Sequence, residues 1–422
     1  MTRRTLLVPL FAAAFVLAPA ELSGQVTPLT EPFMVSPQSY GSTEPGSYTT
    51  KIPTTTALAD GSFVVAWGED LEVIPPGEPS VPYFDLYARK IDADGTPGQL
   101  VRVDRGLLES VETERRPVFP QLAADGQGGF VLAWSRWRFH GSDVLFQTVP
   151  PGEFLHRGGR LLHKPKKNRY EGVASVAANE AGTWVMAWNT KKESTNVRAS
   201  LGVRVFAASG DPVTAEIRIA SSDPEVSLVG PHVAIQQDGS FMVIWGAFAD
   251  GRMQTLQGRT FAANGMPMSE VFQIGQGMNV WEVVNGDPAS GEFLVAWQTD
   301  TGRGPLIRLR RYSPKGRGLG LTELAHERGL RLWRLISNHH GDLVFLWVDT
   351  SGGVLGRLLD PEGVPQGQLF VITNVSDNPW IGDLTISDTG KIFAVWIGPA
   401  EETTPGGATH KPLLGRLWEA QD

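Results

Sequence analysis

The chain of 422 residues contains no cysteine. This absence excludes disulfide bonds, zinc sites with thiolate ligands, thiol catalysis and a lipid-carrying N-terminal cysteine. It does not exclude export from the cell, because a large closed hydrophobic core needs no disulfides. Charge is also modest: 19% of residues are charged, and the net charge is −8. With this balance we expect no binding to nucleic acid or to anionic lipid.

Long apolar runs are missing outside the N-terminus. There, a basic stretch (Thr2-Arg3-Arg4) precedes an apolar one (Leu6 to Ala18), and small residues follow at Ala18-Pro19-Ala20, as in a signal peptide. We therefore expect residues 1–24 to be a signal peptide cleaved near residue 20 or 24. The mature domain, residues 25–422, is then secreted or periplasmic, without stable membrane insertion. The alternative is an N-terminal membrane anchor, for which the apolar stretch is short.

Catalytic and metal-binding motifs are missing as well. No nucleophile lies beside a base in a familiar pattern, and the eight histidines do not form a metal spacing. His339 and His340 are adjacent, but they fall in a predicted tight turn, where neighbours rarely chelate one ion. Ser387-Asp388-Thr389-Gly390 is similar to a sialidase Asp-box, yet it occurs once. We predict no catalytic residue, no metal site and no cofactor.

What the chain does contain is a repeated phrase. Phe63-Val-Val-Ala-Trp67 follows Asp60-Gly61, and similar apolar runs return six times, 49 to 67 residues apart. A repeat of this length, built from short strands, is typical of a β-propeller. We number the repeats 1 to 7 by the buried tryptophan expected in each: Trp67, Trp134, Trp188, Trp245, Trp297, Trp347 and Trp396.

Each repeat predicts one blade of four antiparallel strands, A to D. In repeat 4 the expected strands cover Pro231–Ile235 (A), Phe241–Trp245 (B), a segment ending at Phe261 (C) and Glu270–Ile274 (D). Asp-Gly or Asn-Gly turns separate A from B and C from D. Strand C carries an arginine six residues before a glycine: Arg89, Arg204, Arg259, Arg310 and Arg357. Repeat 2 has Phe146 in that place.

The seventh repeat lacks its last strand. Leu414–Trp418 is a strand C, and the chain stops at Asp422. Near the other end, Glu31–Val35 reads like the D strands of other repeats. We therefore expect an all-β, seven-bladed β-propeller whose ring is closed by an N-terminal strand that completes the last blade. Closure removes the open sheet faces of a linear array.

The repeats, of the form DG-x-FVVAW followed by RxFxxxG, resemble the β-propeller repeat proteins common among secreted bacterial proteins. The resemblance covers nearly the whole mature chain. It implies the fold and says almost nothing about activity.

The strand order defines two faces. A–B and C–D turns form the turn face, and they are short and uniform, so their aspartates are expected to be turn formers. B–C loops and D–A crossings form the loop face, and they vary in length and content. Variable loops on a rigid scaffold are where binding residues concentrate, so we expect ligand on the loop face.

Three groups of residues on the loop face are candidates for a site. Trp281, Trp333 and Trp380 lie at or near the start of strand A and could stack on a sugar or an apolar peptide side chain. Packing between blades is the alternative. Arg136-Trp137-Arg138 could grip an anionic sugar or a carboxylate; the alternative is a solvated loop.

The third group combines carboxylates and guanidinium groups: Glu109, Glu112, Glu114, Arg115 and Arg116. Acid–base chemistry on a glycoside is one interpretation, and a surface loop rich in ion pairs is the other. We predict an exported binding or protein-interaction scaffold whose partner is an unknown protein or glycan. The alternative is a carbohydrate-active enzyme, of glycoside hydrolase or lyase type, with its pocket on the same face. Two carboxylates beside an arginine on that face would favour the enzyme.

Overall fold

The structure is a computed structural model, and its described residues contain strands and turns but no helix. It describes residues 26–36, 53–73, 81–105, 115–138, 141–164, 169–192, 199–221, 226–249, 252–276, 281–285, 290–300, 305–324, 333–348, 353–373, 381–398, 401–402, 409–410 and 412–420. Within these ranges, no helix has the length and hydropathy that crossing a membrane requires.

Four of the repeats each form a separate four-stranded antiparallel sheet. Repeat 1 consists of β3 (Pro53–Ala57), β4 (Phe63–Val73), β5 (Val81–Ile91) and β6 (Pro97–Arg105). Repeat 4 consists of β15 (Ser227–Ile235), β16 (Phe241–Ala249), β17 (Arg252–Phe261) and β18 (Phe272–Gln276). Repeat 5 consists of β19 (Trp281–Asn285), β20 (Phe293–Asp300), β21 (Pro305–Tyr312) and β22 (Gly318–Leu324). Repeat 6 consists of β23 (Trp333–Ser337), β24 (Leu343–Val348), β25 (Val354–Leu359) and β26 (Pro365–Thr373).

Repeats 2 and 3 share one eight-stranded sheet. Repeat 2 contributes β7 (Arg115–Ala124), β8 (Phe130–Arg138), β9 (Gly141–Val149) and the short β10 (Arg160–Leu161). Repeat 3 contributes β11 (Arg169–Ala178), β12 (Trp184–Lys192), β13 (Ala199–Phe206) and β14 (Ile217–Ser221). Within each repeat the strands pair antiparallel, and the two halves meet where β11 runs parallel to β9 for two residues.

The last sheet combines both ends of the described chain. β27 (Ile381–Ile386), β28 (Lys391–Ile397) and β31 (Leu413–Ala420) come from repeat 7. β1 (Val26–Pro28) and β2 (Phe33–Met34) both pair antiparallel with β31. The Arg416 Nε also donates to the Thr30 carbonyl oxygen over 2.8 Å. A separate hairpin is formed by β29 (Glu401–Glu402) and β30 (Thr409–His410).

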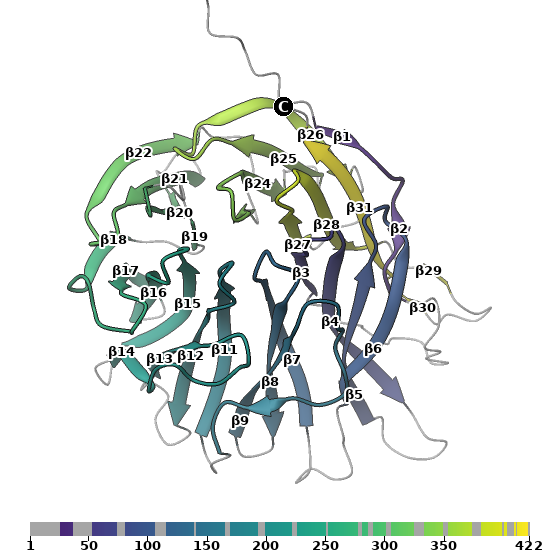
Figure 1. Ribbon diagram of the computed structural model, residues 1–422, viewed down its shortest axis with the longest axis horizontal. Helices are drawn as coiled ribbons and strands as arrows, with labels where there is room; N and C mark the ends of the chain where they lie inside the picture. The colour runs from purple at the N-terminus through teal and green to yellow at the C-terminus, as the bar shows by residue number, and fades with distance from the viewer. Residues whose placement is uncertain are drawn as a thin grey trace, which may run out of the picture.

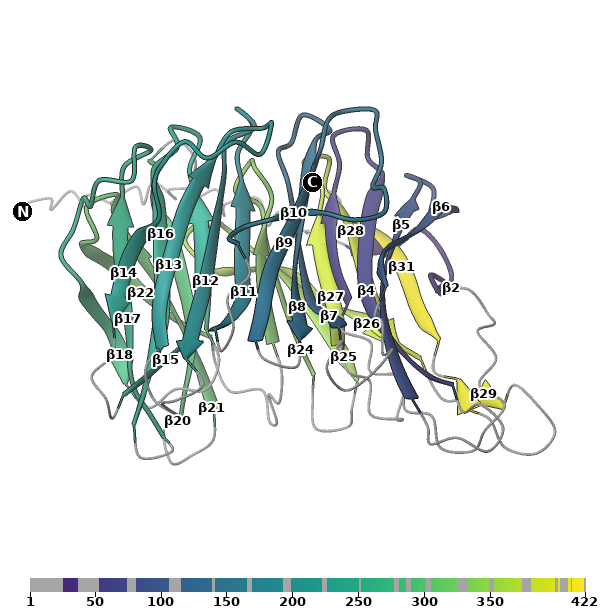
Figure 2. The same ribbon diagram turned by 90° about the horizontal axis from the view of Figure 1, so that it is seen from below.

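The sheets are arranged radially, with the first strand of each repeat nearest the centre (Figure 1). Seen from the side, the strands run across the molecule from one face to the other, so the connections gather on two opposite faces (Figure 2). Each innermost strand contacts the next one, and β27 contacts β3. The backbone N–H of Thr55 in β3 donates to Asp383 in β27 over 2.9 Å. Four-stranded antiparallel sheets around a common centre are the architecture of a β-propeller.

The core lies between neighbouring sheets, because the second strand of each repeat is apolar on both faces. All seven repeat tryptophans are buried, with at most 4% of their surface exposed. One hydrophobic cluster joins Val185 and Val203 of repeat 3 to Phe241 and Trp245 of repeat 4. Another joins Phe63 of repeat 1 to Phe393 and Val395 of repeat 7. Each sheet therefore buries its apolar faces against the sheets beside it.

The turn-face aspartates build turns rather than a site. Asp60 accepts a hydrogen bond from the Ser62 N–H over 2.9 Å, and Gly61 adopts a φ of 79°. The Asp238 side chain accepts from the Ser240 N–H in the same way over 2.8 Å, beside Gly239 with φ 81°. Glycine takes this left-handed conformation without the steric cost that a Cβ brings.

The repeated arginine of the third strand links this strand to the fourth strand, and in repeats 4 and 5 it packs on an aromatic ring. The Arg259 Nε donates to the Ser269 carbonyl oxygen over 3.0 Å, and its guanidinium group lies 5.7 Å from the ring centre of Phe261. Arg310 stands in the same relation to Tyr312. In repeat 2, where Phe146 replaces the arginine, Arg160 of β10 supplies a guanidinium group over that ring at 5.4 Å. The repeated arginine is therefore structural.

Candidate functional site

The centre of the molecule encloses a cavity of about 600 Å³. It is lined by the innermost strand of every repeat: β3, β7, β11, β15, β19, β23 and β27. Lining residues include Pro53 at the start of β3, and also Asn338 and Ser387 just after the ends of β23 and β27. The cavity therefore extends along the inner strands, from the loop face toward the turn face. Its volume is in the range of ordinary small-molecule sites.

Strand pairing places one polar residue from each repeat at the same level of this cavity. Each such residue pairs with the residue just before the repeat tryptophan, as Thr54 does with Ala66 and Glu282 with Ala296. We call this set the polar layer. Its seven members, which all line the cavity, are Thr54, Gln121, Ser175, His232, Glu282, Arg334 and Asp383.

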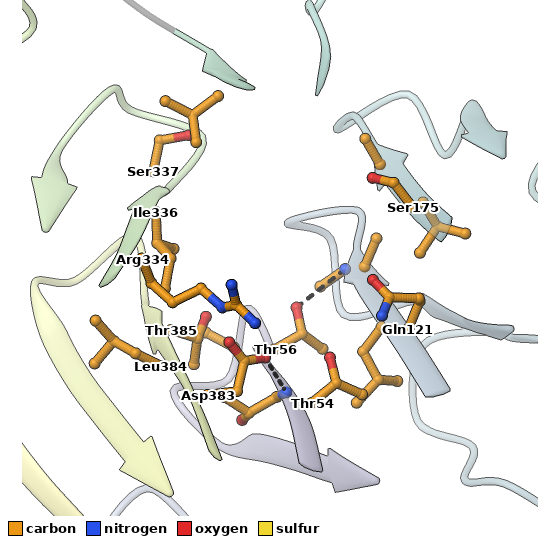
Figure 3. Close-up of a pocket in the computed structure, with 18 of the residues that line it drawn as sticks. Thr54, Thr56, Gln121, Ser175, Arg334, Ile336, Ser337, Asp383, Leu384 and Thr385 are labelled. Carbon is orange, nitrogen blue, oxygen red and sulfur yellow. Dashed lines mark hydrogen bonds between the residues drawn. The ribbon is translucent and has the colours of Figure 1, made fainter. Parts of the chain in front are cut away.

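The four ionisable residues of the polar layer form a chain across repeats 4 to 7. His232 Nδ1 lies 2.8 Å from Glu282 Oε2. The Arg334 Nη1 donates to the other oxygen of Glu282 over 3.1 Å. Arg334 extends over the cavity toward Asp383, which lies beside Thr54 (Figure 3). The Arg334 side chain remains 45% exposed because it faces the cavity, whereas Glu282 is only 12% exposed.

The two carboxyl groups of this chain have pKa values that move in opposite directions. Burial raises the pKa of Asp383 above its ordinary value, and this outweighs the opposing effects of Arg334 and of the Thr55 and Leu384 N–H groups. Burial would also raise the pKa of Glu282, but His232 and Arg334 hold it below the usual range. The Arg334 pKa is raised: burial lowers it, while Glu282 and Asp383 raise it by more.

The remaining members of the polar layer are neutral. The Gln121 side chain donates to the Pro120 carbonyl oxygen over 2.9 Å, and the Ser175 hydroxyl accepts from the Val233 N–H over 3.2 Å. Two positions further along the inner strands the cavity wall becomes mostly small or apolar, with Thr56, Ala123, Ala177, Ala234, Val284, Ile336 and Thr385. Beyond the polar layer, this middle part of the wall therefore offers mainly small and apolar surface.

At the turn-face end, His339 and Asp388 line the cavity as a pair. His339 Nδ1 lies 3.2 Å from Asp388 Oδ2, and the His339 N–H donates to Asp388 Oδ1 over 3.0 Å. Burial lowers the pKa of His339, but Asp388, Glu180 and the Ala124 backbone raise it above the ordinary histidine value. Burial raises the pKa of Asp388, yet the hydrogen bonds and charge of His339 leave it below the usual range.

No group of three or more histidine, aspartate or glutamate side chains suited to a metal ion occurs in the part of the chain that the structure describes. His339 and His340 are neighbours in a tight turn, and His339 makes its hydrogen bonds to Asp388.

The three tryptophans predicted to stack on a ligand, Trp281, Trp333 and Trp380, have different outcomes in the structure. Trp333 is 1% exposed, lies in the core cluster between repeats 5 and 6, and donates to Gln298 over 3.2 Å. Trp333 therefore packs between blades, which was the alternative to a stacking role, and its ring is not open to a ligand. Trp281 begins β19 opposite Trp297, but its side chain is outside the described residues, as is Trp380 altogether.

The predicted group Arg136-Trp137-Arg138 lies at the end of strand β8, and not in a loop as predicted from the sequence. Trp137 is 50% exposed. Arg136 Nη2 lies 2.7 Å from Asp104 Oδ2. Arg138 Nε lies 2.7 Å from Asp143 Oδ2. Both guanidinium groups are thus engaged by buried carboxylates, which weakens the expectation that they grip an anionic ligand.

The acidic cluster proposed from the sequence lies largely outside the described residues. This applies to Glu109, Glu112 and Glu114, and to the side chains of Arg115 and Arg116. The charged residues of the polar layer, Glu282, Arg334 and Asp383, were not singled out by sequence reasoning. Each repeat places a different residue type at this position, so no motif recurs. Aligning each inner strand on the repeat tryptophan would have found them.

The fold and the cavity together define a β-propeller with a polar, partly charged central cavity. No family model and no curated protein sequence matches the chain. Among solved structures it is similar to the Dos1 propeller, with 11% identity over 93% of this chain and 95% of that chain, at a TM-score of 0.49. A second similarity is to the β-propeller domain of the Trilobed protease from Pyrococcus furiosus (11% identity, 86% and 97% coverage, TM-score 0.47).

A third similarity is to a Penicillium chrysogenum alpha-L-arabinanase complexed with arabinobiose. Its identity is 15%, with 82% of this chain and 100% of that chain covered, at a TM-score of 0.43. At these identities and scores the likenesses assign neither a family nor an activity to this chain.

Proposed function

We propose that the chain is an exported, seven-bladed β-propeller that acts as a binding scaffold, with its ligand in the central cavity. Seven inner strands lining one cavity support the blade count, and the pairing of β1 and β2 with β31 supports closure by the N-terminal segment. Export rests on the basic and apolar segments between Thr2 and Ala20.

The polar layer is the observation that carries the binding proposal. A cavity wall that holds Arg334 between Glu282 and Asp383 offers donors and acceptors in fixed positions. The neighbouring hydroxyl and amide groups of Thr54 and Gln121 widen this set. Such preorganised polar groups in a concave site orient a ligand and select it. Ligand reaches them from the loop face, where the inner strands begin.

An array of glycans and peptides tests this proposal with wild type, Arg334→Lys and Arg334→Met. Lysine keeps the charge but loses the planar fork of donors, whereas methionine loses both. We expect both variants to bind the ligand with lower affinity than wild type, or not at all. As a control, Met266→Ala changes an exposed turn-face residue and should bind like wild type. Ligand that binds both Arg334 variants with unchanged affinity would show that the cavity is not the site.

A carbohydrate-active enzyme is the second candidate, and one specific observation favours it. Glu282 and Asp383 both interact with Arg334, and their pKa values are displaced in opposite directions. Glycoside hydrolysis uses two carboxyl groups in such unequal states, one as acid and one as base or nucleophile. In this reading Asp383 donates the proton to the leaving oxygen, and Glu282 attacks or activates water.

Asp383→Asn and Glu282→Gln separate the two candidates. An enzyme should lose turnover of a polysaccharide substrate by at least about 100-fold in either variant, while bound product is still detected. A binding scaffold shows no turnover in the wild type, and the same substitutions change affinity only.

A further inference from the structure

Phe119 adopts a backbone conformation that its residue type disfavours. Its φ is 54°, and it is the only non-glycine residue with a positive φ in the described part of the chain. Phe119 and Pro120 form the irregularity between β7 and β8, where two residues stand opposite Trp134. In repeat 4 the equivalent irregularity contains Gly230 and Pro231, and Gly230 has a φ of 52°.

The comparison with repeat 4 shows what this position requires. The bulge needs a left-handed residue, and glycine meets that need without strain. A phenylalanine there is strained, because its Cβ crowds the following carbonyl oxygen. Phe119 is only partly buried, because 42% of its surface is exposed. Backbone strain of this kind is concentrated at functional sites, so a strained, partly exposed aromatic residue that lines a cavity indicates a role in binding.

Phe119 is not isolated. Its ring centre lies 6.4 Å from that of Trp137, at an interplanar angle of 54°, and Trp137 is itself half exposed. Phe119 lines the cavity from the middle of β7, two residues before the polar-layer residue Gln121. We call Phe119 and Trp137 the aromatic rim. It stands next to the polar layer in the same repeat.

The two described arginines next to Trp137 in the chain both have acidic partners. Arg136 and Arg138, which flank Trp137, are each paired with a buried aspartate. Further into the cavity, the Arg334 charge is shared between Glu282 and Asp383. A strongly anionic or cationic ligand would have to break these pairs, so a neutral ligand fits the site better.

The geometry points to a neutral carbohydrate chain as the ligand. The end sugar of the chain lies in the cavity, where its hydroxyl groups meet the polar layer. The next sugar stacks its apolar C–H face on the aromatic rim. A sugar ring combines an apolar face with a polar edge, and the rim and the layer present those two surfaces side by side. This inference rests on the proposed function, in which the cavity is the binding site.

The test measures how affinity depends on chain length. Neutral cello-, xylo-, manno- and malto-saccharides of one to six units are titrated by calorimetry into the full-length protein. In wild type we expect affinity to rise from one unit to two or three. Trp137→Ala and Phe119→Gly should each lower the affinity for chains of two or three units by about 3- to 10-fold, because each variant loses one stacking ring. Monosaccharide affinity should stay unchanged in both.

The variants carry their own controls. Phe119→Gly should fold at least as well as wild type, since Gly230 adopts the same conformation in repeat 4. Met266→Ala removes an apolar side chain that is 65% exposed on the turn face, and it should keep the full length dependence. Thermal unfolding of all three variants checks that changes in affinity do not reflect unfolding.

The possible outcomes distinguish a failure of this inference from a failure of the proposed function on which it rests. The inference is overturned if no neutral saccharide binds, if the arrayed ligands are peptides or anionic glycans, or if the length dependence persists in both aromatic variants. In each of those cases the cavity proposal still stands when Arg334→Met abolishes binding of the ligand that is found. If Arg334→Met leaves that binding unchanged, the cavity proposal fails by itself.

Discussion

Arg334 Nη1 lies 3.1 Å from Glu282 Oε1, across the boundary between two sheets. The two residues are 52 positions apart in the chain, and each sits at the same level of its own inner strand. Their pairing therefore depends on how neighbouring repeats are aligned, and it links the stability of the ring's centre to the chemistry of the cavity.

Removal of this guanidinium group should destabilise the fold. Arg334→Met leaves His232, whose Nδ1 lies 2.8 Å from Glu282 Oε2, beside Glu282. We expect a loss of about 1–3 kcal/mol in the free energy of unfolding at pH 7. The partners hold the pKa of Glu282 below its ordinary value. That contribution is present above the ordinary glutamate pKa and is lost as pH falls through the folded value, so the difference should shrink toward pH 3. Urea unfolding at both pH values measures it.

Arg308→Met is the matched control for that prediction. Arg308 pairs with Glu323 on the surface, with more than a third of each side chain exposed. Exposed pairs contribute about 0–1 kcal/mol. Equal losses in the two arginine variants would contradict a special role for the Arg334 pair.

The His339–Asp388 pair should give stability a defined pH window. The pKa of His339 is raised, so its contribution is present below the ordinary histidine value and is lost as pH rises through the folded value. The pKa of Asp388 is lowered, so its contribution is lost in acid. We expect His339→Gln to lower the melting temperature most between about pH 4 and pH 6.5. A pH-independent difference would contradict this, and His156→Gln, an exposed loop residue, serves as control.

The repeat tryptophans should carry much of the core energy. Trp245→Ala removes a fully buried ring, whose Nε1 donates to Gln257 over 3.0 Å. We expect a loss of about 3–5 kcal/mol, as for other buried aromatic residues. Trp137→Ala removes a half-exposed ring and should cost far less. Denaturant midpoints that coincide for the two variants would rule out the core role of the repeat.

The N-terminal strands should be needed for a stable last sheet. Deletion of residues 26–36 leaves one edge of β31 unpaired and removes the Val35 carbonyl oxygen that accepts from Arg89 over 2.9 Å. We expect a much lower melting temperature or aggregation through the open edge. A chain that starts at residue 25 is the control. If the deletion melts like this control, closure of the ring by the N-terminal segment is wrong.

Much of the local structure could be read from the sequence because it depends on neighbours in the chain. Asp238-Gly239 forms a turn, and Phe241–Trp245 lies in a strand buried on both faces, as their residue types require. Boundaries were less accurate. Strand β15 begins at Ser227, four residues before the predicted Pro231, because the bulge at Gly230 lets the strand continue past the proline.

The aromatic rim shows how far single residues could be predicted. Trp137 was singled out as an aromatic residue in a loop-face segment, and it is half exposed, with its ring near that of Phe119. Phe119 was missed, because nothing in the letters Val118-Phe119-Pro120 reveals a left-handed backbone. Only the register of β7 against β8 shows that this phenylalanine occupies a position that suits glycine.

The sequence by itself determined the repeat, its turns and its buried tryptophans, since these follow from residue type and spacing along the chain. Tertiary structure decided which polar residues meet. His232, Glu282, Arg334 and Asp383 belong to four different repeats, and no periodic pattern connects them. They share a site because inner strands from distant parts of the chain stand side by side at one level around the cavity, which only the packing of the sheets against one another brings about.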